Sequence, residues 1–143
     1  MKRSQIREQI FKLLFRVEFN DTEDMPEQVE LFMETTTLDK DEDDYKEIVL
    51  SDEEHEYIIK KYDDIMANIA DIDQIIDDNA KGWSRERLGK VELTILRLAI
   101  YEIKYDDDIP VSVAIDQAVE LSKRFGRDES YSFINGILAS VAK

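Results

Sequence analysis

Two arginines and two phenylalanines recur at every fourth position near the amino terminus, in the order Arg3, Arg7, Phe11 and Phe15. Residues four apart lie on the same face of an α-helix. Guanidinium groups bind phosphates and aromatic rings stack on bases, so the row predicts a contact with RNA. The alternative is that the two rings widen a core face while the arginines pair with acidic side chains of the same chain.

A third aromatic side chain, Phe133, raises the same question near the carboxyl end. It lies one helical turn after Glu129 and three residues before Gly136, at the margin of a predicted apolar stripe. An aromatic side chain at such a margin usually packs against the core, but a base-stacking platform would occupy the same place. Gly136 interrupts no stripe, and we expect it to permit a close approach to the helix.

The acidic run DKDEDD imitates half of a calcium-binding loop. Asp39, Asp41 and Asp43 occupy the first, third and fifth positions of the loop pattern. The sixth position, which requires glycine, is Asp44, and the twelfth, which requires glutamate, is Leu50. Both departures remove essential features, so we expect an irregular acidic loop and no metal site.

No combination of residues in the sequence predicts catalysis. There is no cysteine, and the single histidine, His55, falls in an acidic helix start, where we expect a surface side chain. The sequence also lacks a zinc-protease pattern and a glycine-rich phosphate loop. We therefore expect a protein that is not an enzyme and needs no cofactor. The apolar runs IFKLLF and LTILRLAIY are short and carry charges, so a cytoplasmic protein is expected.

Charge is distributed unevenly along the chain, which has 19 basic and 34 acidic side chains and a formal charge of −15. Residues 1–16 hold five basic side chains and one acidic, a net charge of +4. Residues 17–81 hold five basic and 23 acidic side chains, net −18, and residues 82–143 hold nine and ten, net −1. The amino-terminal end is therefore basic, although the chain as a whole is strongly acidic.

Helical periodicity runs through every long segment. Only four glycines and two prolines occur, too few for a many-stranded sheet protein. Apolar residues return every three to four positions in about seven segments, so the predicted fold class is all-α, a compact bundle within a single domain, residues 1–143. The most apolar segment, Arg85–Tyr105, is expected to be the central helix.

Several residues are predicted to begin or end these helices. Ser51 and Glu54 fit a capping box, in which each side chain accepts a hydrogen bond from the other residue's backbone amide. Asp71 or Asp73 could cap the helix that follows. Gly126 is expected to adopt the left-handed conformation that ends many helices.

Three stretches of the carboxyl-terminal half resemble the NusB family of bacterial transcription antitermination factors. They are ILRLAIYEI, IPVSVAIDQAVELSKRFG and DESYSFINGIL, within residues 91–138. Weaker agreement extends to IREQIFKLLF near the amino terminus and to Trp83 and Arg87. The resemblance implies two helical subdomains, residues 1–80 and residues 81–143.

The resemblance also implies a function. Members of the family pair with NusE, a small-subunit ribosomal protein, and the pair binds the single-stranded boxA element of nascent RNA. The complex joins RNA polymerase and other Nus factors and suppresses termination, notably in ribosomal RNA operons, without catalysing a reaction. The cations would then gather at one end to hold the RNA backbone, while the acidic middle would repel RNA elsewhere and attract a basic partner.

Two sets of site residues follow from the resemblance by position. The RNA-binding set is Lys2, Arg3, Arg7, Phe15, Glu129, Ser130 and Phe133. The NusE-binding set is Glu92, Val111 and Gln117. The sequence departs from the family pattern at Ser4, where a basic residue is common. It also departs at two NusE-binding positions: some relatives carry tyrosine in place of Val111 and glutamate in place of Gln117.

Two other functions fit parts of the same pattern. Some ribosomal RNA methyltransferases carry a NusB-like domain in front, but we expect no methyl-donor-binding domain within these 143 residues. A helical protein-interaction module without RNA contact would also suit the high charge and the few nucleic-acid motifs. The sequence leaves open whether the free protein forms a homodimer through its partner surface.

Overall fold

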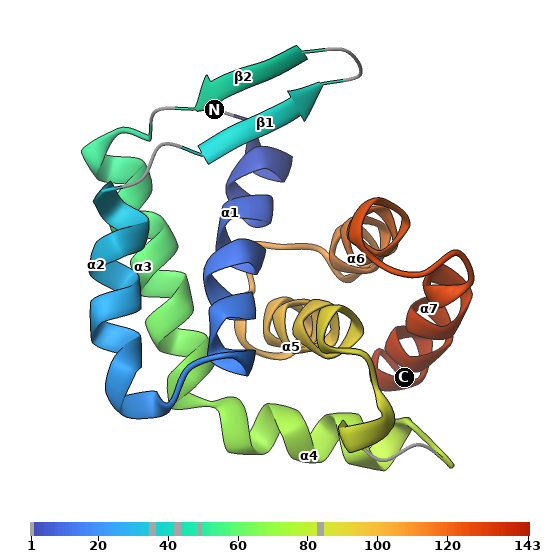
Figure 1. Ribbon diagram of the computed structural model, residues 1–143. Helices are drawn as coiled ribbons and strands as arrows, with labels where there is room; N and C mark the ends of the chain where they lie inside the picture. The colour runs from blue at the N-terminus through green and yellow to red at the C-terminus, as the bar shows by residue number, and fades with distance from the viewer. Residues whose placement is uncertain (1, 35–36, 42–43, 49, 83–84) are drawn as a thin grey trace. The chain divides into compact units, whose positions relative to one another are not determined.

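Seven α-helices and one antiparallel hairpin make up the computed structural model, which describes residues 2–34, 37–41, 44–48, 50–82 and 85–143 (Figure 1). The predicted all-α class is confirmed. The chain separates into two compact units, residues 1–63 and residues 64–143. The division into subdomains at residue 80 stays a prediction.

The first unit contains two complete helices, the hairpin and most of a third helix. Its elements are α1 (Arg3–Phe15), α2 (Met25–Glu34), β1 (Thr37–Asp41), β2 (Asp44–Ile48) and α3 (Asp52–Ala67), which continues into the second unit. A short 3₁₀ turn, Arg16–Glu18, extends α1 and contacts α2. The apolar side chains of α1 recur at helical spacing, and three of them, Ile10, Leu13 and Leu14, are buried.

The acidic segment after α2 forms a hairpin, so the prediction of an irregular loop was wrong. Strand β1 pairs with β2 in antiparallel register, with Thr37 opposite Ile48 and Asp41 opposite Asp44. Threonine, tyrosine and isoleucine favour extended backbone, and cross-strand pairing outweighs the high charge of the segment. Asp39 and Asp41 belong to β1, whereas Asp43 of the imitated calcium loop lies outside the described residues.

The predicted capping box at the start of α3 is confirmed. The backbone amide of Ser51 donates to Oε1 of Glu54 at 2.9 Å, and the amide of Glu54 donates to the Ser51 hydroxyl at 3.1 Å. The hydrogen bond from the Ser51 backbone lowers the pKa of Glu54. The next helix, α4 (Ile69–Asn79), is preceded by Asn68 rather than capped by Asp71 or Asp73.

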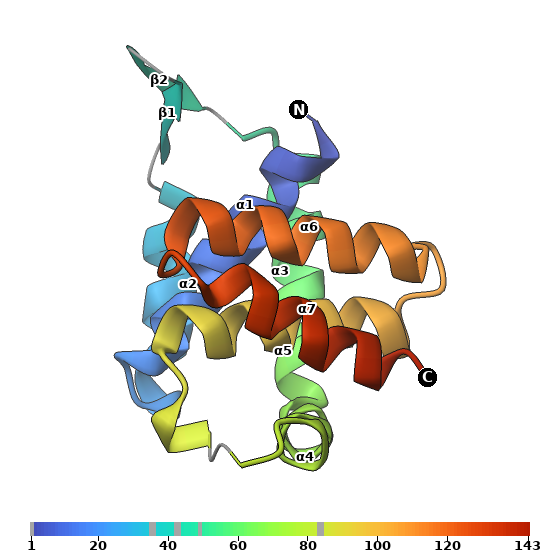
Figure 2. The same cartoon turned by 90° about the vertical axis from the view of Figure 1, so that its right-hand side faces the viewer.

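Helix α5 (Lys90–Tyr105) is the centre of the second unit. It packs against α4, α6 (Val111–Phe125) and α7 (Ser130–Val141), as Figure 2 shows for α6 and α7. Every residue from 92 to 102 is buried, so the predicted central helix is confirmed. It begins at Lys90 rather than Arg85, because a separate 3₁₀ turn occupies Arg85–Arg87.

Two glycine predictions were wrong. Gly126 follows α6 with φ −89° rather than in the left-handed region, which among the described residues is occupied by Gly82 alone, with φ 82°. Gly136 was expected to permit a close approach, but a Cβ atom placed there would have no neighbour within 4 Å. Gly126 is therefore needed for space rather than for its conformation, and Gly136 faces open space.

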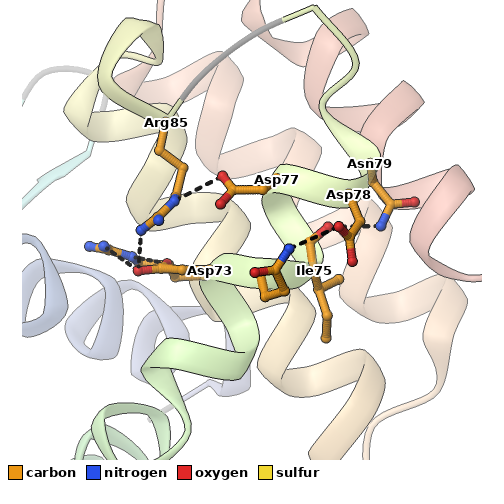
Figure 3. Close-up of polar contacts among 8 residues, drawn as sticks. Asp73, Ile75, Asp77, Asp78, Asn79 and Arg85 are labelled. Carbon is orange, nitrogen blue, oxygen red and sulfur yellow. Dashed lines mark hydrogen bonds and ion pairs between the residues drawn. The ribbon is translucent and has the colours of Figure 1, made fainter.

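An ion-pair network joins α4, the 3₁₀ turn and α5 (Figure 3). The buried carboxylate of Asp73 accepts hydrogen bonds from Arg97 on α5, at 2.9 and 3.0 Å, and from Arg85, at 2.8 Å. Arg85 also donates to Asp77 at 2.9 Å, nearer the surface, and this bond raises the pKa of Arg85. Asp73 therefore neutralises a guanidinium that the central helix buries.

Replacing Asp73 with alanine should strongly destabilise the protein, because Arg97 would remain buried without its carboxylate. Removing one partner of a buried ion pair costs about 3–5 kcal/mol. Asp77→Ala is the matched control, since it removes an exposed partner of Arg85, and such pairs contribute about 0–1 kcal/mol. Urea unfolding of both variants measures the difference, and equal reductions of the unfolding free energy would contradict this assignment.

Candidate nucleic-acid and partner interface

The first cations of the chain differ in exposure. Lys2 and Arg3, at the amino-terminal end of α1, are exposed. The helix begins there because the backbone amide of Lys2 donates to Oε1 of Gln5 at 3.0 Å. Arg7, one turn later, is only 9% exposed. Lys2 and Arg3 can therefore reach a phosphate as the structure stands, whereas Arg7 makes its contacts largely within the protein.

The remaining two basic side chains among residues 1–16, Lys12 and Arg16, make contacts within the first unit. Lys12 forms an ion pair with the buried carboxylate of Glu8 at 3.7 Å. Arg16 donates to the backbone carbonyl of Gln28 at 3.0 Å and places its guanidinium 5.7 Å from the centre of the Phe32 ring. Arg16 thereby fastens the end of α1 to α2. The net charge of +4 overstates the charge available to a ligand.

Three aromatic rings form a row that leads from the interior to solvent. Phe11 is 3% exposed and stacks on Phe15, with ring centres 6.0 Å apart. Phe15 is half-buried and meets the edge of Phe19 at 5.0 Å. Phe19 is 60% exposed. The core interpretation is thus correct for Phe11, while Phe15 retains accessible surface. Phe19 was not predicted, although it continues the spacing of four.

The second set of predicted RNA residues lies at the start of α7, in the other unit. Glu129 is exposed and directly precedes the helix, and Phe133 is half-buried one turn later. Ser130 between them is 9% exposed. Glu129 and Phe133 therefore offer surface to a ligand, whereas the Ser130 side chain points into its own unit.

The buried Ser130 hydroxyl contacts a residue that the sequence assigned to the partner set. It donates to Oε1 of Glu92, on the first turn of α5, at 2.7 Å. It also accepts a hydrogen bond from the backbone amide of Arg127 at 3.1 Å. Glu92 is 7% exposed. The structure therefore brings together one residue from each predicted set, at a junction inside the second unit.

The other predicted partner residues, Val111 and Gln117, both lie on α6. Val111 is exposed at its first turn and Gln117 is half-buried. Six residues of an α-helix turn through about 600°, so the two side chains leave α6 in different directions. Two further apolar side chains near the α5–α6 connection, Tyr105 and Val113, are exposed and were not predicted. Val111 and Val113 are two residues apart and leave α6 on nearly opposite sides, so the two valines do not form one surface.

A second group of aromatic and basic side chains lies at the α6–α7 corner. The Lys123 ammonium is 5.5 Å from the ring centre of Tyr131, and the Arg124 guanidinium is 5.4 Å from that of Phe125. Tyr131 and Phe133 are two residues apart and leave α7 on nearly opposite sides. These contacts were not predicted from the sequence. Neither pair has the three- or four-residue separation that places two side chains on one face of a helix.

Three other features can be assessed in the part of the chain that the structure describes, namely a metal site, a histidine site and a membrane-spanning helix. No group of three or more histidine, aspartate or glutamate side chains there is arranged to hold a metal ion. His55 is half-buried rather than on the surface, and its Nε2 atom accepts and donates no hydrogen bond in the described structure. None of the described helices is long and apolar enough to cross a membrane.

Comparison with known proteins gives consistent matches over nearly the whole chain. The model of the NusB family matches residues 4–143. A transcription antitermination protein NusB from Agathobacter rectalis is 46% identical over 142 residues, which are 99% of this chain and 100% of that protein.

Solved structures agree. The structure of T. maritima NusB has a TM-score of 0.81 and 34% identity, covering 99% of this chain and 91% of that one. A chain from the crystal structure of antitermination factors NusB and NusE in complex with dsRNA has a TM-score of 0.72 and 25% identity, covering 99% and 98%. A family model and relatives that span nearly the full length show that this chain belongs to the NusB family of transcription antitermination proteins.

Proposed function

We propose that this chain, together with NusE, binds the single-stranded boxA element of nascent transcripts and joins RNA polymerase and other Nus factors. Its targets would include ribosomal RNA operons. It acts in the bacterial cytoplasm by binding alone and is not an enzyme. The observation that carries the proposal is the exposure of Lys2 and Arg3 at the only strongly basic end of an acidic chain.

The RNA-binding side chains in this proposal have two chemical tasks. Lys2 and Arg3 bind phosphates, because both are exposed at the start of α1. Phe15 and Phe133 stack on bases, because each is half-buried and so keeps one part of its ring accessible while the rest is held by the protein. A neighbouring structure that contains NusB, NusE and dsRNA supports RNA as the ligand class.

NusE contributes the second half of the interface in this proposal. The apolar side chain of Val111 is exposed at the start of α6 and suits the centre of a protein contact, and Tyr105 is exposed at the end of α5. The net charge of −15 attracts a basic protein over several ångströms and raises the rate of association. The free protein could cover the same apolar surface by forming a homodimer.

The main competing function is a helical interaction module that binds protein without touching RNA. The exposed apolar side chains near the α5–α6 connection favour it as well. The two functions differ in what happens when the exposed cations and the half-buried rings are removed. Only direct RNA contact makes RNA affinity depend on those side chains.

Replacing Lys2 and Arg3 with alanine should weaken RNA binding and flatten its dependence on salt. For a single strand, each phosphate that is no longer neutralised reduces the logarithmic salt slope by about 0.7, so two reduce it by about 1.4. The control is Lys60→Ala with Lys81→Ala, which removes two exposed positive charges from the acidic part of the chain. Filter binding of a boxA-like RNA at several salt concentrations gives both slopes, and an unchanged slope removes these cations from the site.

Phe133→Ala should lower RNA affinity by about 1–3 kcal/mol, the usual contribution of stacking one base on an aromatic ring. The control is Tyr131→Ala, which removes an exposed ring from the opposite side of α7. RNA titration of the folded fraction, with thermal unfolding alongside, separates stacking from packing. A large loss of stability with native RNA affinity would show that Phe133 belongs to the core.

RNA and NusE should bind cooperatively. NusE adds positive charge and a second binding surface to a chain that repels RNA over the screening length of about 8–10 Å. We expect at least about tenfold coupling, or about 1.4 kcal/mol, and RNA must strengthen the protein pair by the same factor.

The measurement titrates a boxA-like single strand and a duplex of the same sequence into this chain, NusE and their mixture. The single strand should bind the mixture more tightly than either protein alone. Equal affinity for the mixture and the better single component would reject the cooperative complex and favour the interaction module.

A further inference from the structure

A buried hydrogen bond fixes the first turn of α7 to the first turn of α5. The Ser130 hydroxyl donates to Oε1 of Glu92 at 2.7 Å and accepts from the Arg127 amide at 3.1 Å, so both of its hydrogen-bonding roles are filled. Glu92 and Ser130 are each less than a tenth exposed. A hydroxyl bound to a carboxylate forms one of the stronger hydrogen bonds in proteins, more so where water is excluded.

Two glycines lie beside this hydrogen bond, and only Gly89 makes space for the carboxylate itself. A Cβ atom on Gly89, directly before α5, would overlap the Glu92 carboxylate. A Cβ atom on Gly126 would lie 2.7 Å from the Ser122 carbonyl oxygen, 3.2 Å from Cβ of Ser130 and 3.4 Å from Oε1 of Glu92. The φ angles of Gly89 and Gly126 are −62° and −89°, which any residue adopts. Close approach to the Ser122 backbone therefore requires glycine at position 126, whereas a side chain at position 89 would displace the Glu92 carboxylate from its place.

Two residues with accessible surface lie next to this bond. Ser130 is the first residue of α7, Glu129 directly precedes it, and Phe133 follows within one turn. A helix that is fixed at its first residue presents the rest of its first turn in one orientation. Neither Ser130 nor Glu92 offers enough surface for a macromolecule to contact while the bond is intact.

We propose that Glu92 and Ser130 are positioning residues, which hold the first turn of α7 so that Glu129 and Phe133 meet RNA in a fixed orientation. This inference rests on the proposed RNA-binding function. It gives Ser130 and Glu92 a different role from the direct contacts with RNA and NusE that the family resemblance implies. Gly89 contributes to the same arrangement, since a side chain there would displace the carboxylate.

The test is a double-mutant cycle on RNA affinity, using the full chain with NusE and a boxA-like RNA. Glu92→Ala and Ser130→Ala should each weaken binding about tenfold, because only the fraction of molecules that keep the native orientation of α7 then binds RNA. The double variant should be no weaker than the weaker single variant, because both changes break one bond. The salt slope should stay unchanged, since the cations that neutralise phosphates are all retained.

Glu92→Gln provides the rescue. Its side-chain carbonyl oxygen can still accept the hydrogen bond from Ser130, so RNA affinity should remain within about threefold of the original protein. Backbone NMR spectra of α7 should change in Glu92→Ala and Ser130→Ala and stay native in Glu92→Gln. If Glu92→Ala does not fold, Ser130→Ala and Glu92→Gln still decide the question.

Three results would overturn the proposal. Losses that add in the double variant would show that Ser130 contacts RNA itself. A loss of NusE affinity in Glu92→Gln, measured without RNA, would place Glu92 in the partner interface. Unchanged RNA affinity in Ser130→Ala while Phe133→Ala still weakens binding would reject the positioning role alone. Absence of RNA binding by the unmodified chain with NusE would instead reject the proposed function and this inference together.

Discussion

Burial of charge in the central helix is the constraint on which the second unit depends. Between residues 92 and 102, α5 is buried on every side, yet it carries Glu92, Arg97 and Glu102. A buried charge without a partner costs several kcal/mol, so each must meet a polar group from a neighbouring element. Asp73 on α4 meets Arg97, and Ser130 on α7 meets Glu92. These polar contacts of α5 thus fix the position of α4 at Asp73 and of α7 at its first residue.

This constraint links the core to the proposed binding surface. Apolar packing alone tolerates small rotations and shifts of a helix, because hydrophobic contact is not directional. A hydrogen bond from a buried serine to a buried carboxylate has a defined length and direction. The first turn of α7 consequently takes its position from the interior, and Glu129 and Phe133 become surface residues with a set orientation. The RNA site we propose here is therefore supported by residues that RNA does not touch.

The amino-terminal helix divides its charges between folding and binding. Arg16 contacts Gln28 and Phe32, and Lys12 pairs with Glu8, so these cations stabilise the first unit. Of the described cations at this end, only those at the very start of α1 are exposed. A small number of available cations on a chain of net charge −15 gives weak attraction for RNA by itself, which is the physical reason for the basic partner that we propose.

The helices, one cap and the family could all be predicted from local patterns. Helical periodicity, the paired spacing of Ser51 and Glu54, and the carboxyl-terminal stretches each lie within a short run of residues, where spacing alone reveals them. The hydrogen bond between Glu92 and Ser130, and the need for space rather than a left-handed turn at Gly126, became visible in three dimensions alone. Phe19 continues the spacing of four in the sequence, but its exposure to solvent became visible only in the structure. The hydrogen bond joins residues that are distant in sequence, and the exposure of a side chain depends on which helix face the rest of the protein covers. Tertiary packing determines both, and the spacing of residues in the sequence does not reveal them.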